Sequence, residues 1–418
     1  MIESWLQSTG LMLPPLLRDG GYRYVLVTRD PDLYRLPDGA RHPVLALAAE
    51  VVVAETNDDT VLAAAAQEVA GRRRIDGVLT TCDYYLPAVA LVAEELGLPG
   101  APADVLRTAT RKHLVRQVLA ARGVPDVPFA VAATWDQAHK AAAELGYPLV
   151  VKPVDMNSGT GVRKVADEAG LAVAFAAATG PERNTRDQPL ERLVLLERVL
   201  EGPEYSVESV TRDGVTRVLG ITAKSVAEPD AEAGSGFVES GHLFPAPLAP
   251  DERDAIERHV VAVLGAVGLT HGISHTEVRV TAAGPRLIEL NPRQGGGYIF
   301  ELVRLVTGFN PLQVLVDLAL GREPVPGPVA AVSAAVTFVL PAVDGVVREV
   351  RGAQRLADDD RVLSHETPSA GREVRPGDNN ERIGHVLVAD RSGYEAKAWA
   401  DELVATVDIE VAARALTS

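Results

Sequence analysis

Apolar and polar residues alternate with two different periods in the first quarter of the chain. Between residues 1 and 105, short apolar runs such as YRYVLVTRD and DGVLTTCD alternate with Ala- and Leu-rich stretches such as TVLAAAAQEVAGRR. The runs are typical of buried strands and the stretches are typical of helices. This alternation predicts βαβ units and a parallel sheet. Because the chain begins with a helix-like pattern, we expect the first strand of that sheet to be shortened, to be absent, or to be missing because the start of the sequence was wrongly assigned.

The pattern after residue 105 indicates helices that end at glycine and lead into strands. LRTATRKHLVRQVLAARGVPDVP predicts a helix that ends at Gly123 and Pro125. The next stretch, TWDQAHKAAAELGYPLVVKPV, predicts a helix, a glycine stop and a strand. PERNTRDQPLE is charged and punctuated by proline, so we expect an exposed connection there.

Two hairpins and a small end domain are expected in the second half. YSVESVTRDGVTRVLGITAK has strand character with a hairpin signal at RDG, and ISHTEVRVTAAGPRLIELNPR is the clearest hairpin of the chain. DERDAIERHVVAVLGAVGL predicts an amphipathic helix with acidic residues at its start. From about residue 326 the pattern indicates a small α+β domain. A chain of 418 residues exceeds one hydrophobic core, so these elements predict a multi-domain α/β and α+β protein.

Composition and charge narrow the classes of ligand. Hydrophobic residues make up 47% and charged residues 23%, as in ordinary globular proteins. The formal net charge of −16 argues against a nucleic-acid partner or an anionic membrane surface, because phosphate groups repel such a chain. Any anionic ligand must therefore be met by locally placed cations.

The single cysteine and the lack of a targeting signal bear on location. With Cys82 alone the chain has no internal disulfide framework and no multi-thiolate metal site, which fits a reducing cytosol. A buried small residue is the favoured role for Cys82, ahead of a nucleophile. No apolar run reaches the ~18 residues of a membrane span. The start MIESWLQSTG lacks the basic and long apolar regions of a signal peptide, so we expect a cytoplasmic protein.

The stretch YPLVVKPVDMNSGTGVRKV, residues 147–165, combines a buried-looking strand with a polar, glycine-containing loop. It lacks the Walker A pattern and the third glycine of a dinucleotide fingerprint. Lys152 on the strand and the loop Ser158-Gly159-Thr160-Gly161 still offer charge, hydroxyls and accessible backbone N–H groups to phosphate oxygens. A plain hairpin turn with a surface lysine is the alternative interpretation. The position of Lys152 among LVVKPV weighs against it, because buried lysines are rare unless paired.

The hairpin ISHTEVRVTAAGPRLIELNPR brings two carboxylates together. With the turn placed at Ala282-Ala283-Gly284, residues whose numbers sum to about 566 face each other. Thr281 is then expected to pair with Pro285, and Glu277 with Glu289, with Cβ atoms roughly 5 Å apart. Like charges directly opposite are destabilising, so something must compensate them.

Further side chains support a metal at this hairpin. Asn291 points to the same face and adds a neutral oxygen, and such a set suits hard cations such as Mg²⁺. Arg293 is placed to reach an anion next to the metal. A solvated acidic face is the alternative interpretation. Zinc at His271 and His275 is disfavoured, because Gly272 and the strand alternation do not allow the helix that this spacing needs.

The chain resembles the ATP-grasp superfamily in an ordered set: Lys112, VVKPVDMNSGTGV, LLERVLEGPEYSVE, FVESGHLFPA and HTEVRVTAAGPRLIELNPRQGGGY. Within it, the chain is most similar to the carboxylate-amine ligases that include the bacterial L-amino acid ligases (dipeptide synthetases). The resemblance covers nearly the whole chain from 20 to 410. It implies an ATP-grasp fold with an N-terminal Rossmann-like (pre-ATP-grasp) domain. The expected division is a pre-ATP-grasp α/β domain (1–105), a lid subdomain (106–190), a catalytic subdomain (191–325) and a small C-terminal α+β domain (326–418).

The resemblance implies a role for each matching residue. Residues expected to contact ATP are Lys112, Lys152, Ser158, Gly159, Thr160 and Gly161 at the phosphates, Glu197, Arg198, Val199 and Leu200 at the adenine, and Glu204 at the ribose. Residues expected to hold metal are Glu277, Glu289 and Asn291, and Arg293 and Lys152 are expected to be catalytic. His242, Arg293 and Gly296 are expected to border the substrate pocket. The loop at 156–161 is expected to be a mobile lid.

The implied reaction has two steps. A carboxylate attacks the γ-phosphate of ATP to give an acyl-phosphate and ADP, with two Mg²⁺ ions offsetting charge and Mn²⁺ as a substitute. The amine of a second substrate then displaces phosphate and forms an amide. The expected partners are an amino acid or small carboxylic acid and an amine, and a homodimer is left open. The alternatives are a phosphoribosylamine-type ligase, a biotin carboxylase-like enzyme and a non-catalytic ATP-binding protein.

Three consecutive glycines depart from some relatives. Gly295, Gly296 and Gly297 stand where some dipeptide synthetases carry a bulky aromatic residue. We therefore expect a roomier pocket, which Gly297→Trp should narrow. The poorly represented first strand leaves the outer wall of the substrate site undefined.

Overall fold

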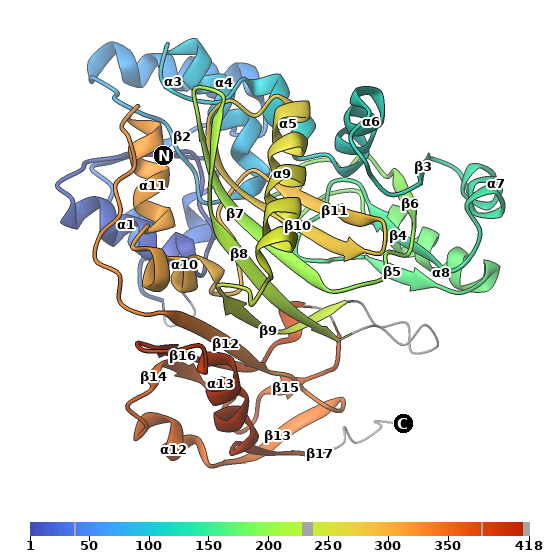
Figure 1. Cartoon of the computed structure of the whole chain (residues 1–418). Coiled ribbons are helices and arrows are strands. Elements are labelled where there is room, and N and C mark those ends of the chain that lie inside the picture. The colour runs from blue at the N-terminus through green and yellow to red at the C-terminus, as the bar shows by residue number, and fades with distance from the viewer. Residues whose placement is uncertain (37–38, 228–236, 378, 413–418) are drawn as a thin grey trace, which may run out of the picture.

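The computed structural model describes residues 1–36, 39–227, 237–377 and 379–412 (Figure 1). Residues 413–418 of the expected end domain lie outside the described residues. The strands form sheets of two, four, eight and three strands. The chain contains a parallel sheet together with antiparallel sheets, and helices pack against them, as in α/β and α+β proteins. This confirms the predicted fold class. The predicted domain boundaries stay a prediction.

The N-terminal part contains the short parallel sheet. Its elements are α1 (Thr9–Asp19), β1 (Val25–Thr28), η1 (Pro31–Tyr34), α2 (Pro43–Ala46), β2 (Glu50–Val53), α3 (Asp59–Arg72), η2 (Asp83–Tyr85) and α4 (Leu86–Glu95). β1 and β2 pair in parallel, as predicted. Ile2 forms a parallel bridge with Val27, and its N–H donates to the Leu79 carbonyl at 3.0 Å. The first strand is therefore present but shortened to a few residues before α1.

A four-stranded antiparallel sheet follows two connecting helices. The helices are α5 (Ala103–Ala109) and α6 (Lys112–Arg122), and the sheet has the order β3-β6-β4-β5. Its strands are β3 (Phe129–Ala132), β4 (Leu149–Pro153), β5 (Arg163–Val165) and β6 (Val194–Arg198), packed against α7 (Trp135–Leu145) and α8 (Glu168–Thr179). As predicted, α6 ends at Gly123, which takes the left-handed conformation with φ of 68°.

The eight-stranded sheet has the order β11-β10-β7-β8-β9-β12-β16-β14. Its strands are β7 (Glu204–Arg212), β8 (Val215–Ala227), β9 (Val238–Phe244), β10 (Gly272–Thr281), β11 (Gly284–Asn291), β12 (Ser333–Val339), β14 (Val362–Glu366) and β16 (Gly384–Asp390). α9 (Pro250–Val267) packs on its first half and α13 (Ala396–Ala405) on its second (Figure 1). The sheet runs on past residue 326, because β12 pairs with β9. β13 (Gly345–Arg351), β15 (Glu373–Val374) and β17 (Asp408–Ala412) form the three-stranded sheet beside α12 (Ala353–Ala357) and η3 (Asn379–Glu381).

Two helices connect β11 to β12. α10 (Ile299–Thr307) and α11 (Pro311–Ala319) bury most of their apolar residues. Among the described residues, no single helix has the length and hydropathy needed to cross a membrane. α10 and α11 meet that requirement only when taken together, and the pair is bent by 88°.

The two predicted hairpins form, and one of them differs in its turn. β7 and β8 turn at Asp213-Gly214, as predicted from RDG. In the second hairpin Thr281 pairs with Gly284 and Pro285 pairs with Val280, so the predicted three-residue turn and the Thr281–Pro285 pair were wrong. A register shift between Glu277 and Val278 restores the expected alignment, and Glu277 lies opposite Glu289 as predicted. The extra residue on β11 is a β-bulge at Ile288.

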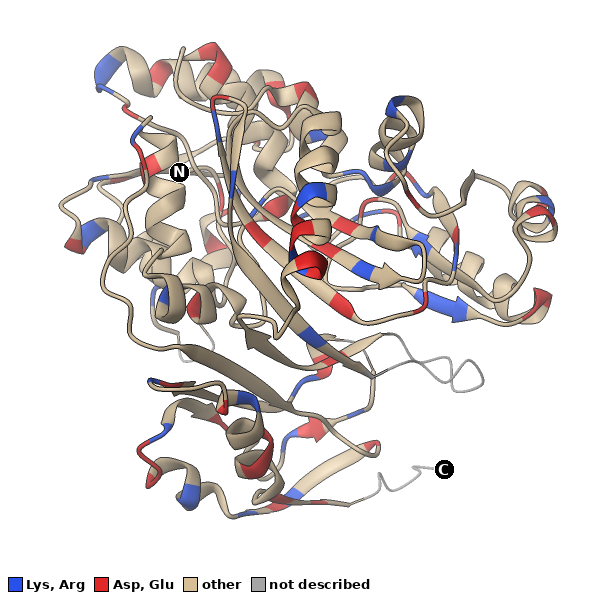
Figure 2. Ribbon diagram, in the orientation of Figure 1, with Lys and Arg blue, Asp and Glu red and all other residues tan. Residues whose placement is uncertain are grey.

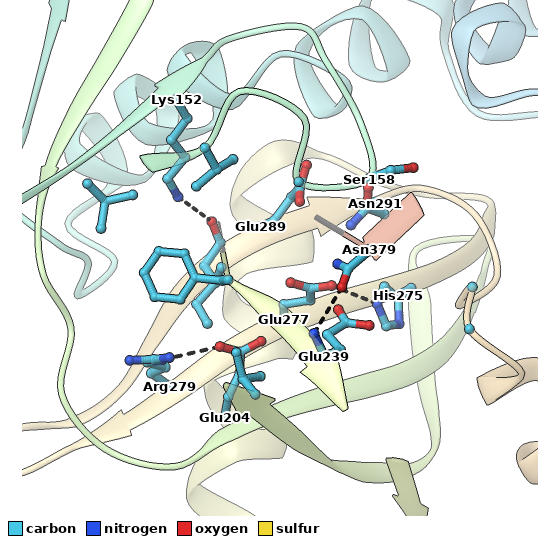
Figure 3. Close-up of a pocket in the computed structure, with 18 of the residues that line it drawn as sticks. Lys152, Ser158, Glu204, Glu239, His275, Glu277, Arg279, Glu289, Asn291 and Asn379 are labelled. Atoms are coloured by element: carbon cyan, nitrogen blue, oxygen red, sulfur yellow. Dashed lines mark hydrogen bonds and ion pairs between the residues drawn. The ribbon is translucent and has the colours of Figure 1, made fainter. Parts of the chain in front are cut away.

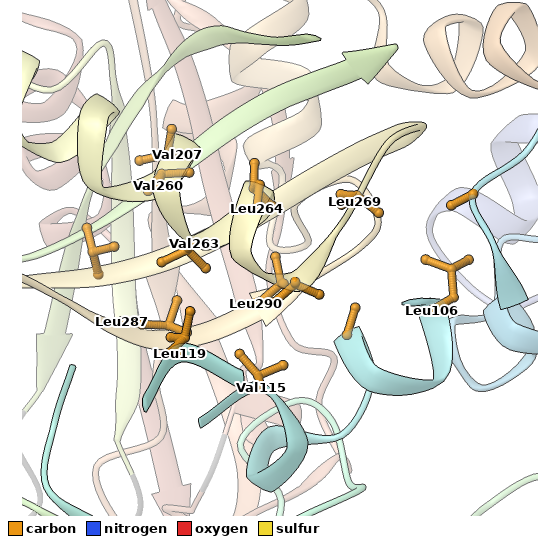
Figure 4. Packing of buried hydrophobic residues seen from close by; sticks show 14 of the residues in the cluster. Leu106, Val115, Leu119, Val207, Val260, Val263, Leu264, Leu269, Leu287 and Leu290 are labelled. Atoms are coloured by element: carbon orange, nitrogen blue, oxygen red, sulfur yellow. The ribbon is translucent and has the colours of Figure 1, made fainter. Parts of the chain in front are cut away.

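The hydrophobic cluster under α9 fixes β10 and β11 against α5 and α6 (Figure 4). Its labelled members are Leu106, Val115, Leu119, Val207, Val260, Val263, Leu264, Leu269, Leu287 and Leu290. Burial of one such side chain is worth about 1.5–3 kcal/mol relative to exposure. The start of α6 is thereby held beside the end of β11.

The segment 181–191 is not simply exposed. Arg186 is buried, donates to the Ser4 carbonyl at 2.5 Å and lies over the Trp5 ring. Arg29 forms an ion pair with Asp187 at 3.1 Å. The expectation of an exposed connection therefore holds for much of the segment, including Asp187, and fails at Arg186, which is buried against the N-terminal part.

Candidate active site

A cavity of about 300 Å³ lies between the four-stranded sheet and the first half of the eight-stranded sheet (Figure 3). Sequence-predicted residues that line it are Lys112, Lys152, Ser158, Gly159, Glu197, Arg198, Val199, Leu200, Glu204, Glu277, Glu289, Asn291, Arg293 and Gly296. Residues from segments as far apart as 112 and 296 thus share one cavity. Both signs of charge occur on β10 and β11 (Figure 2), so cations are placed locally in a chain of strongly negative net charge.

Three predicted residues do not line the cavity. Thr160 and Gly161 belong to the glycine loop but lie outside the lining set. His242 is completely buried, and its Nε2 lies 3.3 Å from an Oε atom of Glu239. This corrects the expectation that His242 borders the substrate pocket: it reaches the cavity only through Glu239 and Gly297.

Lys152 and Lys112 converge on the cavity from two segments. Lys152 on β4 is 5% exposed, which excludes the surface-lysine interpretation. Its Nζ lies 2.5 Å from Oε2 of Glu197. Lys112, the first residue of α6, places its Nζ 2.9 Å from Oε1 of Glu289 and donates to the Met156 carbonyl at 2.5 Å. The burial of Lys152 is therefore explained by a protein carboxylate, which the sequence did not indicate.

Arg116 holds this side of the cavity together. Its Nε donates to Glu197 at 2.6 Å, and its other nitrogens donate to Asp126 and, at 3.0 and 2.9 Å, to the carbonyls of Leu287 and Ile288. Burial alone would raise the pKa of Glu197, but Arg116 and Lys152 hold it below its usual value. Arg116 thus joins α6, β6 and the bulge of β11, a role that its helical position did not reveal.

Three residues of the glycine loop have positive φ. Ser158, Gly159 and Gly161 have φ of 57°, 72° and 74°, which only glycine adopts without strain. Asn157 accepts a hydrogen bond from the Tyr84 hydroxyl at 2.9 Å, so the loop also contacts the N-terminal part. Its mobility as a lid stays a prediction.

The facing carboxylates of the β10–β11 hairpin are compensated by different cations. Lys112 lies against Glu289, whereas Lys224 at 2.9 Å and His275 at 3.0 Å both contact Oε1 of Glu277. Burial would raise the pKa of Glu277, but Lys224 and the His275 hydrogen bond lower it to about 2. Burial would lower the pKa of His275, but Glu208 at 2.7 Å and Glu277 raise it to about 9. The compensation expected from the sequence is therefore present.

The donor set fits a hard divalent cation. Glu277, Glu289 and Asn291 all face the cavity and offer only oxygen ligands. Within the described ranges no group of three His, Cys, Asp or Glu residues forms a metal cluster. Such a site is typical of Mg²⁺, which takes few carboxylates and completes its shell with water and phosphate oxygens. His271 bonds to the Leu318 carbonyl from a loop before β10, which agrees with the argument against zinc.

One part of the cavity lining combines apolar side chains with Glu204. Val199 and Leu200 follow β6, and Phe237 and Val226 face them across the cavity. Arg279 lies 3.2 Å from Glu204 and donates to the Leu200 carbonyl at 2.8 Å. Phe237 and Arg279 were not found from the sequence, because nothing local distinguishes them from ordinary strand residues.

Other lining residues come from distant segments. Arg382 contacts Glu239 at 2.6 Å and, with Asn379 and Asn380, brings the C-terminal part into the cavity wall. Asp83 accepts from Arg293 Nε at 2.6 Å, so the N-terminal part reaches the same place. Sequence reasoning missed these residues, since only the folded chain places them beside β10 and β11.

The three glycines differ in the space around them. A Cβ on Gly296 would meet nothing within 4 Å, whereas one on Gly297 would lie 2.9 Å from His242 Nε2 and 3.3 Å from Arg382. One on Gly295 would lie 3.0 Å from His275. The additional pocket space expected from the three glycines is therefore beside Gly296. A substitution meant to narrow the pocket should be made at Gly296 and not, as expected from the sequence, at Gly297.

A second cavity of about 440 Å³ adjoins the first. It shares Lys112, Glu289, Asn291 and Arg293 with the first cavity and is also lined by Asp83. Glu289 and Asn291 thus line both cavities, whereas Glu277 lines only the first, and the second cavity also borders the N-terminal part.

Family models match three successive parts of the chain. The ATP-grasp N-terminal domain matches residues 19–100, the ATP-grasp domain matches 145–301, and the L-amino acid ligase C-terminal domain 2 matches 337–412. The middle match spans most of the first cavity, including both strands of the carboxylate hairpin. The last match contains Asn379, Asn380 and Arg382.

Individual relatives agree with these models. An L-amino acid ligase from Bacillus licheniformis has the same fold, with a TM-score of 0.80, 24% identity and coverage of 98% of each chain. Carnosine synthase 1 of Gallus gallus is 32% identical over 60% of this chain and 28% of its own length. Alanine–anticapsin ligase of Bacillus subtilis is 26% identical over 61% of this chain and 56% of its own length. The match thus spans about a quarter to a half of these two curated relatives.

Proposed function

We infer that this chain, which belongs to the ATP-grasp superfamily, is an ATP-dependent carboxylate-amine ligase. The observation that carries this inference is the single cavity that Lys112 and Lys152 share with Glu277, Glu289 and Asn291. Cations for phosphates and oxygen ligands for a metal thus lie in the same cavity, with Lys112 beside Glu289. The C-terminal match to L-amino acid ligases favours amide formation over the phosphoribosylamine-type and biotin carboxylase-like alternatives.

The reaction needs two steps. An oxygen of the substrate carboxylate attacks the γ-phosphorus, the bond to the β-phosphate oxygen breaks, and acyl-phosphate and ADP result. Lys112, Lys152 and Arg293 offset the charge on the transferring group. The amine of the second substrate then attacks the acyl carbon, phosphate leaves, and the nitrogen loses a proton. No protein nucleophile is required.

We assign the nucleotide and metal sites from the types of residue that line the cavity. We place the adenine by Glu197, Arg198, Val199 and Leu200, with the ribose hydroxyls on Glu204. ATP-grasp enzymes use ATP and divalent metal ions, and we propose two Mg²⁺ ions at Glu277, Glu289 and Asn291, with Mn²⁺ able to replace them. When bound, such ions offset phosphate charge and orient the reacting oxygens.

The two substrates are proposed to meet at Arg293. Arg293 lines both cavities, and its partner Asp83 lines the second. An amino acid or small carboxylic acid and an amine therefore have a space beside the proposed phosphate site. We propose no nucleic-acid or membrane partner, given the acidic chain. The need for ATP fits the proposed cytoplasmic location, and a homodimer is kept as a proposal.

The test is phosphate release with ATP and Mg²⁺ in the presence of pairs of amino acids and small carboxylic acids. Release that needs both members of a pair, with an amide in the products, is expected. Glu289→Gln removes one metal ligand while keeping the shape, and should abolish release. Tight ATP binding without release for any pair would instead favour a non-catalytic ATP-binding protein.

A further inference from the structure

Lys224 is buried behind the cavity wall and stands where three carboxylates meet. It lies on β8 opposite Glu204 of β7, and only 1% of its side chain is exposed. Its Nζ lies 3.0 Å from Oε1 of Glu204, 2.8 Å from Oε1 of Glu239 and 2.9 Å from Oε1 of Glu277. All three carboxylates line the cavity, whereas Lys224 does not (Figure 3).

Each of these carboxylates also has a cation of its own. Arg279 lies by Glu204, Arg382 by Glu239 and His275 by Glu277. The three serve different parts of the site: the proposed ribose contact, the contact with the C-terminal part and the proposed metal ligand. Among the described residues, Lys224 is the one cation that forms an ion pair with all three.

The contacts of Lys224 place one positive charge among three negative ones. An oxygen of each of Glu204, Glu239 and Glu277 lies within 3.0 Å of its Nζ. Three carboxylates that converge in a buried place need such a charge, because an uncompensated buried charge is strongly destabilising. A divalent cation also needs several oxygen ligands around it, at metal–oxygen distances of about 2.0–2.6 Å. A small contraction of the three carboxylates toward their centre would provide these distances.

We propose that Lys224 is a built-in counter-cation that excludes a divalent metal ion from the centre of Glu204, Glu239 and Glu277. It thereby acts as a positioning residue: Oε1 of Glu277 is committed to Lys224 and His275, and the other oxygen is directed to the metal in the cavity. The second part rests on the proposed function. The first part depends only on the contacts of Lys224.

The test counts Mn²⁺ ions bound to the full chain without nucleotide, by calorimetry and by electron paramagnetic resonance of free Mn²⁺. Lys224→Met keeps the length of the side chain and removes its charge. We expect this variant to bind one Mn²⁺ per chain more than the unaltered protein, and its melting temperature to rise with Mn²⁺. Lys152→Met is the matched control, because Lys152 contacts one carboxylate and should gain no ion.

A folded Lys224→Met that binds no additional Mn²⁺ would overturn the proposal. If the variant does not fold even with Mn²⁺, the double variant Lys224→Met/Glu239→Gln removes one carboxylate together with the cation. Recovery of folding in the double variant supports the proposal, and continued failure overturns it. Because the readout is ion binding, absence of ligase activity in every screen would contradict the proposed function but leave this result standing.

Discussion

Two buried lysines lie at or near the candidate active site, and their surroundings differ. Lys152 on β4 is 5% exposed, lines the cavity and contacts one carboxylate, Glu197. Lys224 on β8 is 8% exposed as a whole residue, with 1% of its side chain exposed, and it does not line the cavity but contacts three carboxylates. Only Lys152 lines the cavity and can contact a ligand there, and Arg116 would still compensate Glu197.

The difference shows that burial of a lysine does not by itself identify a phosphate ligand. The sequence argument for Lys152 depended on its burial, and Lys224 is buried almost as well. What separates them is the layer in which they lie, at the cavity or behind it. Gly296 and Gly297 both line the cavity, but a side chain on Gly296 would enter open space and one on Gly297 would meet His242, which lies behind the cavity wall.

Among the substitutions that test this comparison, Lys152→Met should lower turnover most. Loss of one cation at the transferring phosphoryl group is expected to lower kcat by roughly 10²–10³-fold, as for other charge-stabilising donors. Lys140→Met, on the exposed face of α7, is the matched control and should leave turnover unchanged. The measurement is steady-state phosphate release together with the affinity for a nonhydrolysable ATP analogue. Turnover within threefold of the unaltered protein would remove Lys152 from the phosphate site.

Gly296→Val should sharpen the distinction between the two layers. Its methyl groups would enter the open space at the cavity, so kcat/KM for large substrates should fall roughly 10–100-fold relative to small ones. Gly297→Val should instead lower stability by about 1–3 kcal/mol through overpacking and left-handed strain, without changing the preference. Competition assays with small and large amino acids and urea unfolding distinguish the two. An altered preference for Gly297→Val alone would reverse the assignment.

Much of the fold could be predicted because its signals are local. The parallel pairing of β1 and β2 follows from the period of apolar residues, and the RDG turn and the Gly123 helix end follow from the residues themselves. The β10–β11 turn failed by one residue, since a bulge at Ile288 has no sequence signal. The alignment of Glu277 with Glu289 was right because the bulge offsets the shorter turn.

The candidate site was predictable only in part for the same reason. Residues on one hairpin or one loop, such as Glu277 and Ser158, stand beside other residues of matching chemistry in the sequence, so their role can be predicted from it. Lys224, Arg116 and Arg382 act through partners more than ten residues away in sequence, and no local pattern distinguishes them from exposed charges. His242 was assigned to the pocket from its motif, whereas the fold places it one layer behind.

Glu204→Gln should have the smallest effect and tests a residue that belongs to both layers. Glu204 lines the cavity, where we propose that it accepts from the ribose, and its Oε1 contacts Lys224 behind it. A neutral amide keeps the shape but weakens a charge-assisted hydrogen bond, worth about 1.5–3 kcal/mol, so the KM for ATP should rise roughly tenfold with little change in kcat. Because Glu239 and Glu277 still compensate Lys224, the melting temperature should fall only slightly. A large loss of stability with an unchanged KM would mean that Glu204 serves Lys224 alone, and the ribose would need another partner.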